Sequence, residues 1–157
     1  RIDKQKIKKA IMQNNKQKEY LLSEILFILN NDEKLDDKFM IIKDEINNKN
    51  FSQAALNYSI SSTNNNGGNL GWVKESVLST KIKKQINKIQ IGEITDPIII
   101  PGGFLILKVN QSRETKKNLD LEKEMKIVIN KKTNEQLNQF SNVYFKKVKK
   151  NVVINEL

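Results

Sequence analysis

A glycine-rich loop near the middle of the chain constrains the fold more than any other feature. Its centre, residues 66–72, holds three glycines within five residues and the chain's single tryptophan. Glycine adopts backbone conformations that other residues avoid, so this stretch predicts a tight loop and not the interior of a helix or strand. Two motifs follow it: Gly-Glu-Ile-Thr-Asp-Pro at 92–97 and Gly-Gly-Phe-Leu-Ile-Leu-Lys-Val at 102–109. They predict a corner, and then a turn that leads into a strand.

The apolar pattern on either side of this loop predicts helices and strands. Apolar residues recur at helical spacing in three segments, which we expect to be helices: 35–47, 51–58 and 76–88. Apolar runs predict strands at 98–100 and 104–110, joined by a hairpin turn at 101–103. The run at 21–29 has the length of a buried strand, although its periodicity alone also allows a helix.

The two ends of the chain carry further helical patterns. Residues 1–19 predict a helix, or part of one, in which Ile7, Ala10 and Ile11 share a face. From Asn118 a second helical region begins, and the pattern Thr-Asn-Glu-Gln at 133–136 is that of a capping box. It predicts that a new helix starts there, and a short strand is expected at 151–155.

Composition excludes several classes of site. The 157 residues include neither cysteine nor histidine. This excludes disulfides, thiolate nucleophiles and zinc sites of the cysteine type, and it removes the commonest general base. We expect no metal and no cofactor. No apolar run approaches the roughly 18 residues of a membrane-spanning helix, so no membrane insertion is expected. The first residue is Arg1 and not methionine, which predicts a fragment or a processed product.

The net charge of +10 invites three kinds of acidic partner. Nucleic acid, an anionic membrane surface and acidic client proteins would each be attracted. The plain alternative is solvated helix faces in a lysine- and asparagine-rich chain. Aromatic residues are not interleaved with the lysine clusters, as base stacking would require, so nucleic-acid binding is the least favoured. The lysines that precede and follow the central region are Lys4, Lys6, Lys8, Lys9, Lys16, Lys18, Lys146, Lys147, Lys149 and Lys150.

The order of motifs resembles the parvulin-type peptidyl-prolyl isomerase domain, particularly as built into SurA-like periplasmic chaperones. The likeness rests on the glycine loop with its tryptophan, the Gly-Glu-Ile-Thr-Asp-Pro corner and the closing strand, and covers roughly Ser23 to Gln111. It implies an α+β fold of the FKBP-like class, a four-stranded and mostly antiparallel sheet wrapped by helices. It also decides for a strand at 21–29, and it implies that the strands at 23–29 and 104–110 are central.

The resemblance divides the chain into three parts. Residues 21–112 would be the parvulin-like domain, and residues 1–20 the end of an N-terminal helical chaperone region cut short in this fragment. Residues 113–157 would supply C-terminal helices and a short strand that pack with that region in a separate helical unit. We therefore expect Ile7 and Ile11 to pack against a stripe of Leu137, Phe140 and Tyr144, and not onto the sheet.

At three positions where the family keeps polar residues around the prolyl pocket, this chain differs. The first-strand histidine is replaced by Glu24, and the last-strand histidine by Leu105. The acid or cysteine that follows the Tyr-Ser pair is replaced by Ser61. A catalyst must be tuned to the twisted amide, and these groups offer no evident means of lowering its barrier of about 18–20 kcal/mol. We therefore expect weak isomerase activity or none.

An apolar peptide-binding groove is nevertheless expected in the parvulin-like domain. For most of its residues the alternative is plain core packing. The groove residues would be Leu70, Trp72, Ile82, Ile86, Phe104 and Leu105.

These observations favour a SurA-like periplasmic folding factor that binds unfolded or nascent outer-membrane polypeptides. The alternative is an active peptidyl-prolyl cis-trans isomerase with an unusual pocket, and the less favoured reading is a basic nucleic-acid-binding protein. Exposed terminal helices would leave an apolar stripe uncovered, and such patches recruit partners, so dimerisation is expected there.

Overall fold

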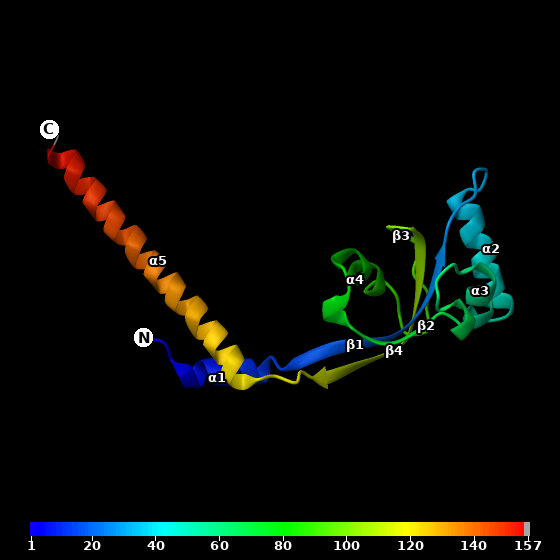
Figure 1. Ribbon diagram of the computed structural model, residues 1–157, viewed down its shortest axis with the longest axis horizontal. Coiled ribbons are helices and arrows are strands. Elements are labelled where there is room, and N and C mark those ends of the chain that lie inside the picture. Colours follow the sequence, from blue (N-terminus) through cyan, green and yellow to red (C-terminus); the bar gives the residue numbers. More distant parts are fainter. Residues whose placement is uncertain (156–157) are drawn as a thin grey trace. The chain divides into compact units, whose positions relative to one another are not determined.

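The computed structural model describes the backbone of residues 1–155 and the side chains of residues 1–151 (Figure 1). The chain divides into two compact units. Unit 1 comprises Arg1–Lys16 together with Lys116–Leu157, and unit 2 comprises Gln17–Thr115. The boundaries predicted from the sequence, at 20/21 and 112/113, lie a few residues from these.

Unit 2 is built on a four-stranded antiparallel sheet, as predicted. The strand order is β2 (Asn69–Lys74), β1 (Lys16–Phe27), β4 (Gly103–Lys116) and β3 (Ile98–Ile100). Strands β1 and β2 pair antiparallel, and so do β3 and β4. Between β1 and β4, Ser23 bonds Asn110 and Glu19 bonds Arg113, so these strands also run in opposite directions. The predicted central position of β1 and β4 is confirmed.

Three helices cover this sheet: α2 (Leu35–Asn48), α3 (Phe51–Tyr58) and α4 (Thr80–Ile86). The Asn50 side chain caps α3 by accepting from the Gln53 amide at 2.8 Å, and Ser79 caps α4 by accepting from the Ile82 amide at 3.3 Å. The helix predicted at 76–88 is therefore shorter than expected, because its first turn is a separate 3-10 turn at Glu75–Val77. Helices α2 and α3 lie on one side of the sheet and α4 on the other (Figure 1).

Alternation along β4 divides the core into two layers. Leu105, Leu107 and Val109 pack with α4 in one cluster, whereas Phe104 and Ile106 pack with α2 and α3 in the other. Successive side chains of a strand point to opposite faces, so a single central strand supplies both layers. The apolar stripe predicted for 35–47 lies in the second layer, which confirms that helix: Leu35, Phe39, Ile42 and Ile46.

The glycine loop leads directly into a strand that the sequence did not place. Residues 69–74 form the edge strand β2, in which Trp72 pairs with Leu21 of β1. The register shifts between Leu22 and Ser23, so β2 carries a bulge beside the glycines. Local glycine content marked the turn correctly, but the pairing partner for β2 lies about 50 residues away in sequence.

Unit 1 contains α1 (Lys4–Gln13) and α5 (Leu121–Asn155). The segment after α1 bonds the segment before α5, since the Lys117 amide donates to the Asn15 carbonyl at 2.8 Å. Asp3 caps α1 by accepting from the amides of residues 5 and 6. The helix predicted over residues 1–19 is too long, because residues 16–19 belong to β1. Among the described helices, none is long and apolar enough to cross a bilayer.

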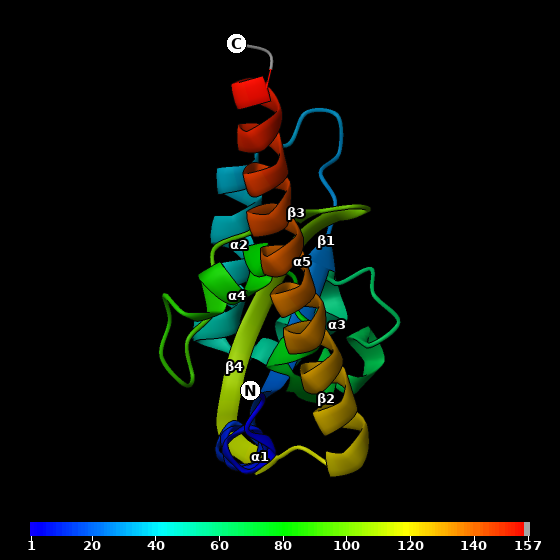
Figure 2. The same cartoon turned by 90° about the vertical axis from the view of Figure 1, so that its left-hand side faces the viewer.

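Helix α5 is continuous, which corrects two predictions (Figure 2). The capping box at 133–136 does not start a new helix. Instead, the Thr133 hydroxyl donates to the Ile129 carbonyl at 2.8 Å, a bond that threonine makes inside a helix. The short strand predicted at 151–155 is also wrong, since these residues continue α5. A helix satisfies its backbone groups internally, whereas a strand there would need a pairing partner.

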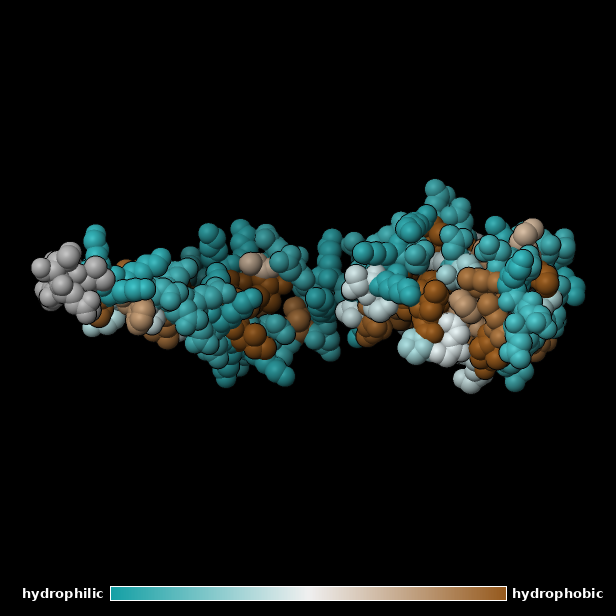
Figure 3. Space-filling view, turned by 90° about the horizontal axis from the view of Figure 1, so that it is seen from above, coloured by the Kyte–Doolittle hydropathy of each residue, from teal (hydrophilic) through white to brown (hydrophobic). Residues whose placement is uncertain are grey.

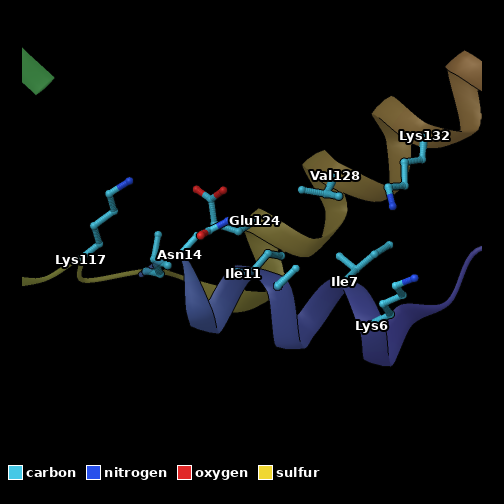
Figure 4. A pocket seen from close by; sticks show the side chains of 10 residues that line it. Lys6, Ile7, Ile11, Asn14, Lys117, Glu124, Val128 and Lys132 are labelled. Carbon is cyan, nitrogen blue, oxygen red and sulfur yellow. The ribbon is translucent and has the colours of Figure 1, made fainter. Parts of the chain in front are cut away.

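The predicted partner of α1 is wrong as well. Ile7 and Ile11 point toward Val128 and line one groove with it and with Leu119, whereas Leu137, Phe140 and Tyr144 do not line that groove (Figure 4). Those three side chains are 61%, 74% and 71% exposed. At 100° per residue they lie roughly 120–180° around α5 from Val128, so a helix that contacts Val128 cannot cover them. The apolar face of α5 changes sides along its length.

Candidate functional site

Glu24, on the central strand β1, lies at the centre of a small hydroxyl network. Its Oε1 accepts hydrogen bonds from the Ser61 hydroxyl at 2.5 Å and the Thr63 hydroxyl at 2.9 Å. The two hydroxyls also contact each other at 3.2 Å. The structure therefore brings two of the three predicted polar positions, Glu24 and Ser61, into direct contact.

The loop that carries Ser61 is fastened along β1 by its own bonds. The Ser59 hydroxyl accepts from the Leu26 amide at 3.1 Å and from the Ser61 amide at 3.3 Å. The Ile60 amide donates to the Leu26 carbonyl at 2.7 Å. Because both backbone and side-chain groups are tied to β1, the hydroxyls of this loop are held in place beside Glu24.

The glycine loop also contacts the backbone of Glu24. The Glu24 amide donates to the Gly68 carbonyl at 2.8 Å, and Gly68 has a φ of +74°. A Cβ at Gly68 would collide with the Glu24 carbonyl oxygen. Glycine is therefore required here both by the positive φ and by the close approach of the two backbones.

The third predicted position, Leu105, is not part of this network. It is 6% exposed and lies in the core cluster together with Ile82 and Ile86 of α4. Its side chain can neither donate nor accept a hydrogen bond. In this chain Leu105 therefore contributes to core packing and not to a polar network.

Of the other predicted groove residues, Ile82 and Ile86 lie with Leu105, but Leu70, Trp72 and Phe104 do not. Phe104 lies on the opposite face of the sheet, where its ring stacks on Phe27 with centroids 5.6 Å apart. Leu70 is exposed in the bulge of β2. Alternation along a strand could have separated Phe104 from Leu105 at the outset.

Trp72 belongs to a site that the sequence did not indicate. The Arg113 guanidinium lies 3.9 Å from the centroid of its ring, and Arg113 Nε donates to Glu19 Oε2 at 2.7 Å. Neighbouring Val73 packs with Leu105, so Trp72 points to the other face. This arrangement joins β2, β1 and β4 through a cation–π contact and an ion pair. No local sequence signal links the three residues.

The chemistry available around Glu24 is limited to oxygen groups. A carboxylate accepts hydrogen bonds, and hydroxyls donate and accept them, but the chain contains no imidazole, the group that readily exchanges a proton near neutral pH. Thr63, which sequence reasoning missed, completes the set. The run Ser-Ile-Ser-Ser-Thr at 59–63 was the signal that could have found it. Within residues 1–151, the structure groups no three acidic side chains as a metal site would.

Comparison with known proteins assigns the fold to a family. The Rotamase family, described as the PPIC-type PPIASE domain, matches residues 5–111, well over half of the chain. The chain belongs to this family. The match includes the resemblance to parvulins found between Ser23 and Gln111 and extends it to α1.

Several curated relatives of this PPIC-type chain are named as chaperones or foldases. The chaperone SurA of Pseudomonas putida KT2440 is 39% identical over 69 residues, which cover 44% of this chain and 16% of the relative. SurA of Methylobacillus flagellatus is 31% identical over 94 residues, or 59% of this chain and 21% of the relative. The foldase protein PrsA of Bacillus subtilis is 34% identical over 87 residues, covering 54% of this chain and 29% of PrsA. The chain therefore spans well under half the length of these relatives.

Solved structures share the fold of this PPIC-type chain. A PpiC-type peptidyl-prolyl cis-trans isomerase domain is 28% identical with a TM-score of 0.54, covering 65% of this chain and 96% of that one. Another structure, whose description names two SurA-like chaperones of Campylobacter jejuni, is 21% identical with a TM-score of 0.57. It covers 88% of this chain and 62% of that one, and at this identity it shows the fold alone.

Proposed function

We propose that the chain is part of a SurA-like periplasmic folding factor that binds unfolded client polypeptides, including outer-membrane ones. Membership of the PPIC-type family and the chaperone relatives support this assignment. By the same likeness, unit 2 would be the parvulin-like module, and unit 1 would belong to the helical chaperone region.

We further propose that this module binds clients without efficient prolyl isomerisation. The observation that supports the proposal is the hydroxyl network of Glu24 with Ser61 and Thr63, together with buried Leu105. Glu24, Ser61 and Leu105 would occupy the three positions at which the family keeps polar residues. Catalysis requires groups that stabilise the twisted amide better than the planar one. An oxygen-only network and an apolar side chain provide no such differential contact.

The first prediction concerns catalysis. We expect a catalytic efficiency on proline-containing peptides well below the range of about 10⁴–10⁸ M⁻¹s⁻¹ typical of enzymes. A protease-coupled peptide assay measures it, and an active PPIC-type domain assayed in parallel serves as the control. In the same preparations, the chain should reduce aggregation of an unfolded outer-membrane protein. An efficiency within the typical range would instead support the alternative, an active isomerase with an unusual pocket.

The second prediction concerns self-association. We propose that α5 pairs with a second copy through its exposed apolar face. Lys146 and Lys150 lie roughly 120–160° around the helix from Tyr144 and Val148, whereas Lys147 lies close to Phe140 at the edge of the face. The exposed apolar residues of the face are Leu137, Phe140, Tyr144 and Val148, and Val143 and Phe145 are exposed to either side of it.

Sedimentation velocity tests this pairing over a range of concentrations. Phe140→Ser combined with Tyr144→Ser is expected to raise the dissociation constant of the dimer by about tenfold or more, because buried aromatic side chains dominate interfaces. Ile99→Ser, at an exposed apolar position on unit 2 (62%), is the control and should leave the dissociation constant unchanged. A wild-type chain that stays monomeric at all concentrations would contradict the pairing.

A further inference from the structure

The net charge of the protein resides entirely in unit 1. Unit 1 carries 16 Lys and Arg residues against six Asp and Glu, whereas unit 2 carries 12 of each. The total of +10 is therefore the charge of unit 1 alone, and unit 2 is neutral. A solvated lysine-rich composition would be expected to spread over both units. Such segregation gives unit 1 a positive potential that attracts acidic groups.

Unit 1 also contains an apolar groove between its two helices. The groove has a volume of about 480 Å³, within the usual range of about 300–1,000 Å³ for binding pockets. Ile7 and Ile11 of α1 point toward Val128 of α5 across it (Figure 4). The space-filling view shows apolar surface over this part of unit 1, bordered by hydrophilic side chains (Figure 3). Ala10 and Leu119 complete the apolar lining.

The rim of this groove is cationic. Lys6 and Lys132 lie at one end and Lys117 at the other, beside Asn14 (Figure 4). Glu124 is the one carboxylate among the lining residues. In the part of the chain with described side chains, none of the three lysines forms an ion pair with a carboxylate. Their charges therefore remain available to a partner.

We propose that this groove binds client segments in which apolar side chains are flanked by acidic residues. This rests on the proposed client-binding function and names the class of client that unit 1 selects. Apolar side chains of the client would contact Ile7, Ile11 and Val128, and its flanking carboxylates would pair with the unpaired lysines at the two ends. A basic flank would be repelled, so the rim provides selectivity while the apolar lining provides affinity.

Binding of three labelled peptides to the whole chain tests the proposal. The peptides share one apolar centre of leucine and phenylalanine and carry glutamate, serine or lysine flanks. We expect fluorescence anisotropy to give the glutamate peptide an affinity about tenfold higher than that of the serine peptide, and the lysine peptide the weakest binding. The advantage of the glutamate peptide should shrink as salt rises from low to physiological concentration.

Two triple variants with the same loss of charge locate the effect. Lys6→Gln, Lys117→Gln and Lys132→Gln should abolish the preference for glutamate flanks, so that the glutamate and serine peptides bind this variant with equal affinity. Lys8→Gln, Lys9→Gln and Lys146→Gln remove the same charge from unit 1 outside the groove, and should retain most of the preference. Circular dichroism establishes that both variants keep their helices.

Each contrary result has a distinct meaning. Equal affinity for the glutamate and serine peptides would overturn the charge selectivity and leave the proposed client binding standing. An equal loss in both triple variants would show that charge acts diffusely, and would overturn the assignment to the groove. Absence of binding to every peptide would overturn the proposed client binding itself. A DNA duplex that displaces the glutamate peptide at lower concentration than unlabelled peptide would make the groove a polyanion site and overturn the proposal.

Discussion

Replacing Phe27 by alanine is expected to lower the free energy of unfolding of unit 2 by about 3–5 kcal/mol. Phe27 is 1% exposed on the central strand β1, and its ring stacks on Phe104. The substitution removes the transfer free energy of the ring and leaves a cavity between the sheet and helices α2 and α3. Urea unfolding followed by the fluorescence of Trp72, the single tryptophan and a residue of unit 2, measures the loss.

The matched control is the same substitution at an exposed phenylalanine. Phe140 is 74% exposed on α5, and Phe140→Ala should change the unfolding of unit 2 by no more than about 0.5 kcal/mol. The comparison also tests the separation into two units. If Phe140→Ala lowered the stability reported by Trp72 as much as Phe27→Ala does, the two units would unfold as one core.

Replacing Gly68 by alanine is expected to cost about 3 kcal/mol or more. A non-glycine residue at a φ of +74° costs roughly 1–2 kcal/mol, and the added Cβ would also collide with the Glu24 carbonyl oxygen. To avoid that collision the glycine loop must shift away from β1, which weakens the hydrogen bond from the Glu24 amide to the Gly68 carbonyl. The same denaturation experiment measures this effect.

Gly71 separates the collision from the backbone conformation. Its φ is +70°, close to that of Gly68, but a Cβ there would meet no atom within 4 Å. Gly71→Ala should therefore show only the conformational cost, about 1–2 kcal/mol. Similar losses at both positions would mean that the contact between the glycine loop and β1 does not limit stability.

The absence of histidine and the spacing of the motifs could be known from the sequence alone. Apolar patterns located α2, α3, β3 and β4, because the apolar residues of each element recur at the spacing that puts them on its buried face or faces. The order of the motifs and the family resemblance led to the prediction that Glu24, Ser61 and Leu105 stand where the family keeps polar residues. Glycine tolerates conformations that other residues do not, so its positions are informative without a structure.

Local sequence patterns gave wrong or missing predictions at two segments: the helix start predicted at 133 and the edge strand β2. The capping box at 133–136 is locally sound, yet α5 passes through it and Thr133 bonds Ile129. The edge strand β2 looked like a loop, because its backbone bonds go to β1 far away in sequence. β2 forms because β1 supplies partners for its backbone groups, whereas the uninterrupted α5 satisfies its own and needs no partner strand.

Side-chain groupings across the fold were decided only by the tertiary structure. Thr63 joins Glu24 across 39 positions of sequence, and Arg113 reaches Glu19 across 94. The concentration of charge in unit 1 likewise depends on residues 1–16 folding with residues 116–157. Sequence patterns report contacts along one helix or strand, where geometry fixes which residues meet. Contacts between segments depend on how those segments dock, and docking is determined by packing over the whole unit.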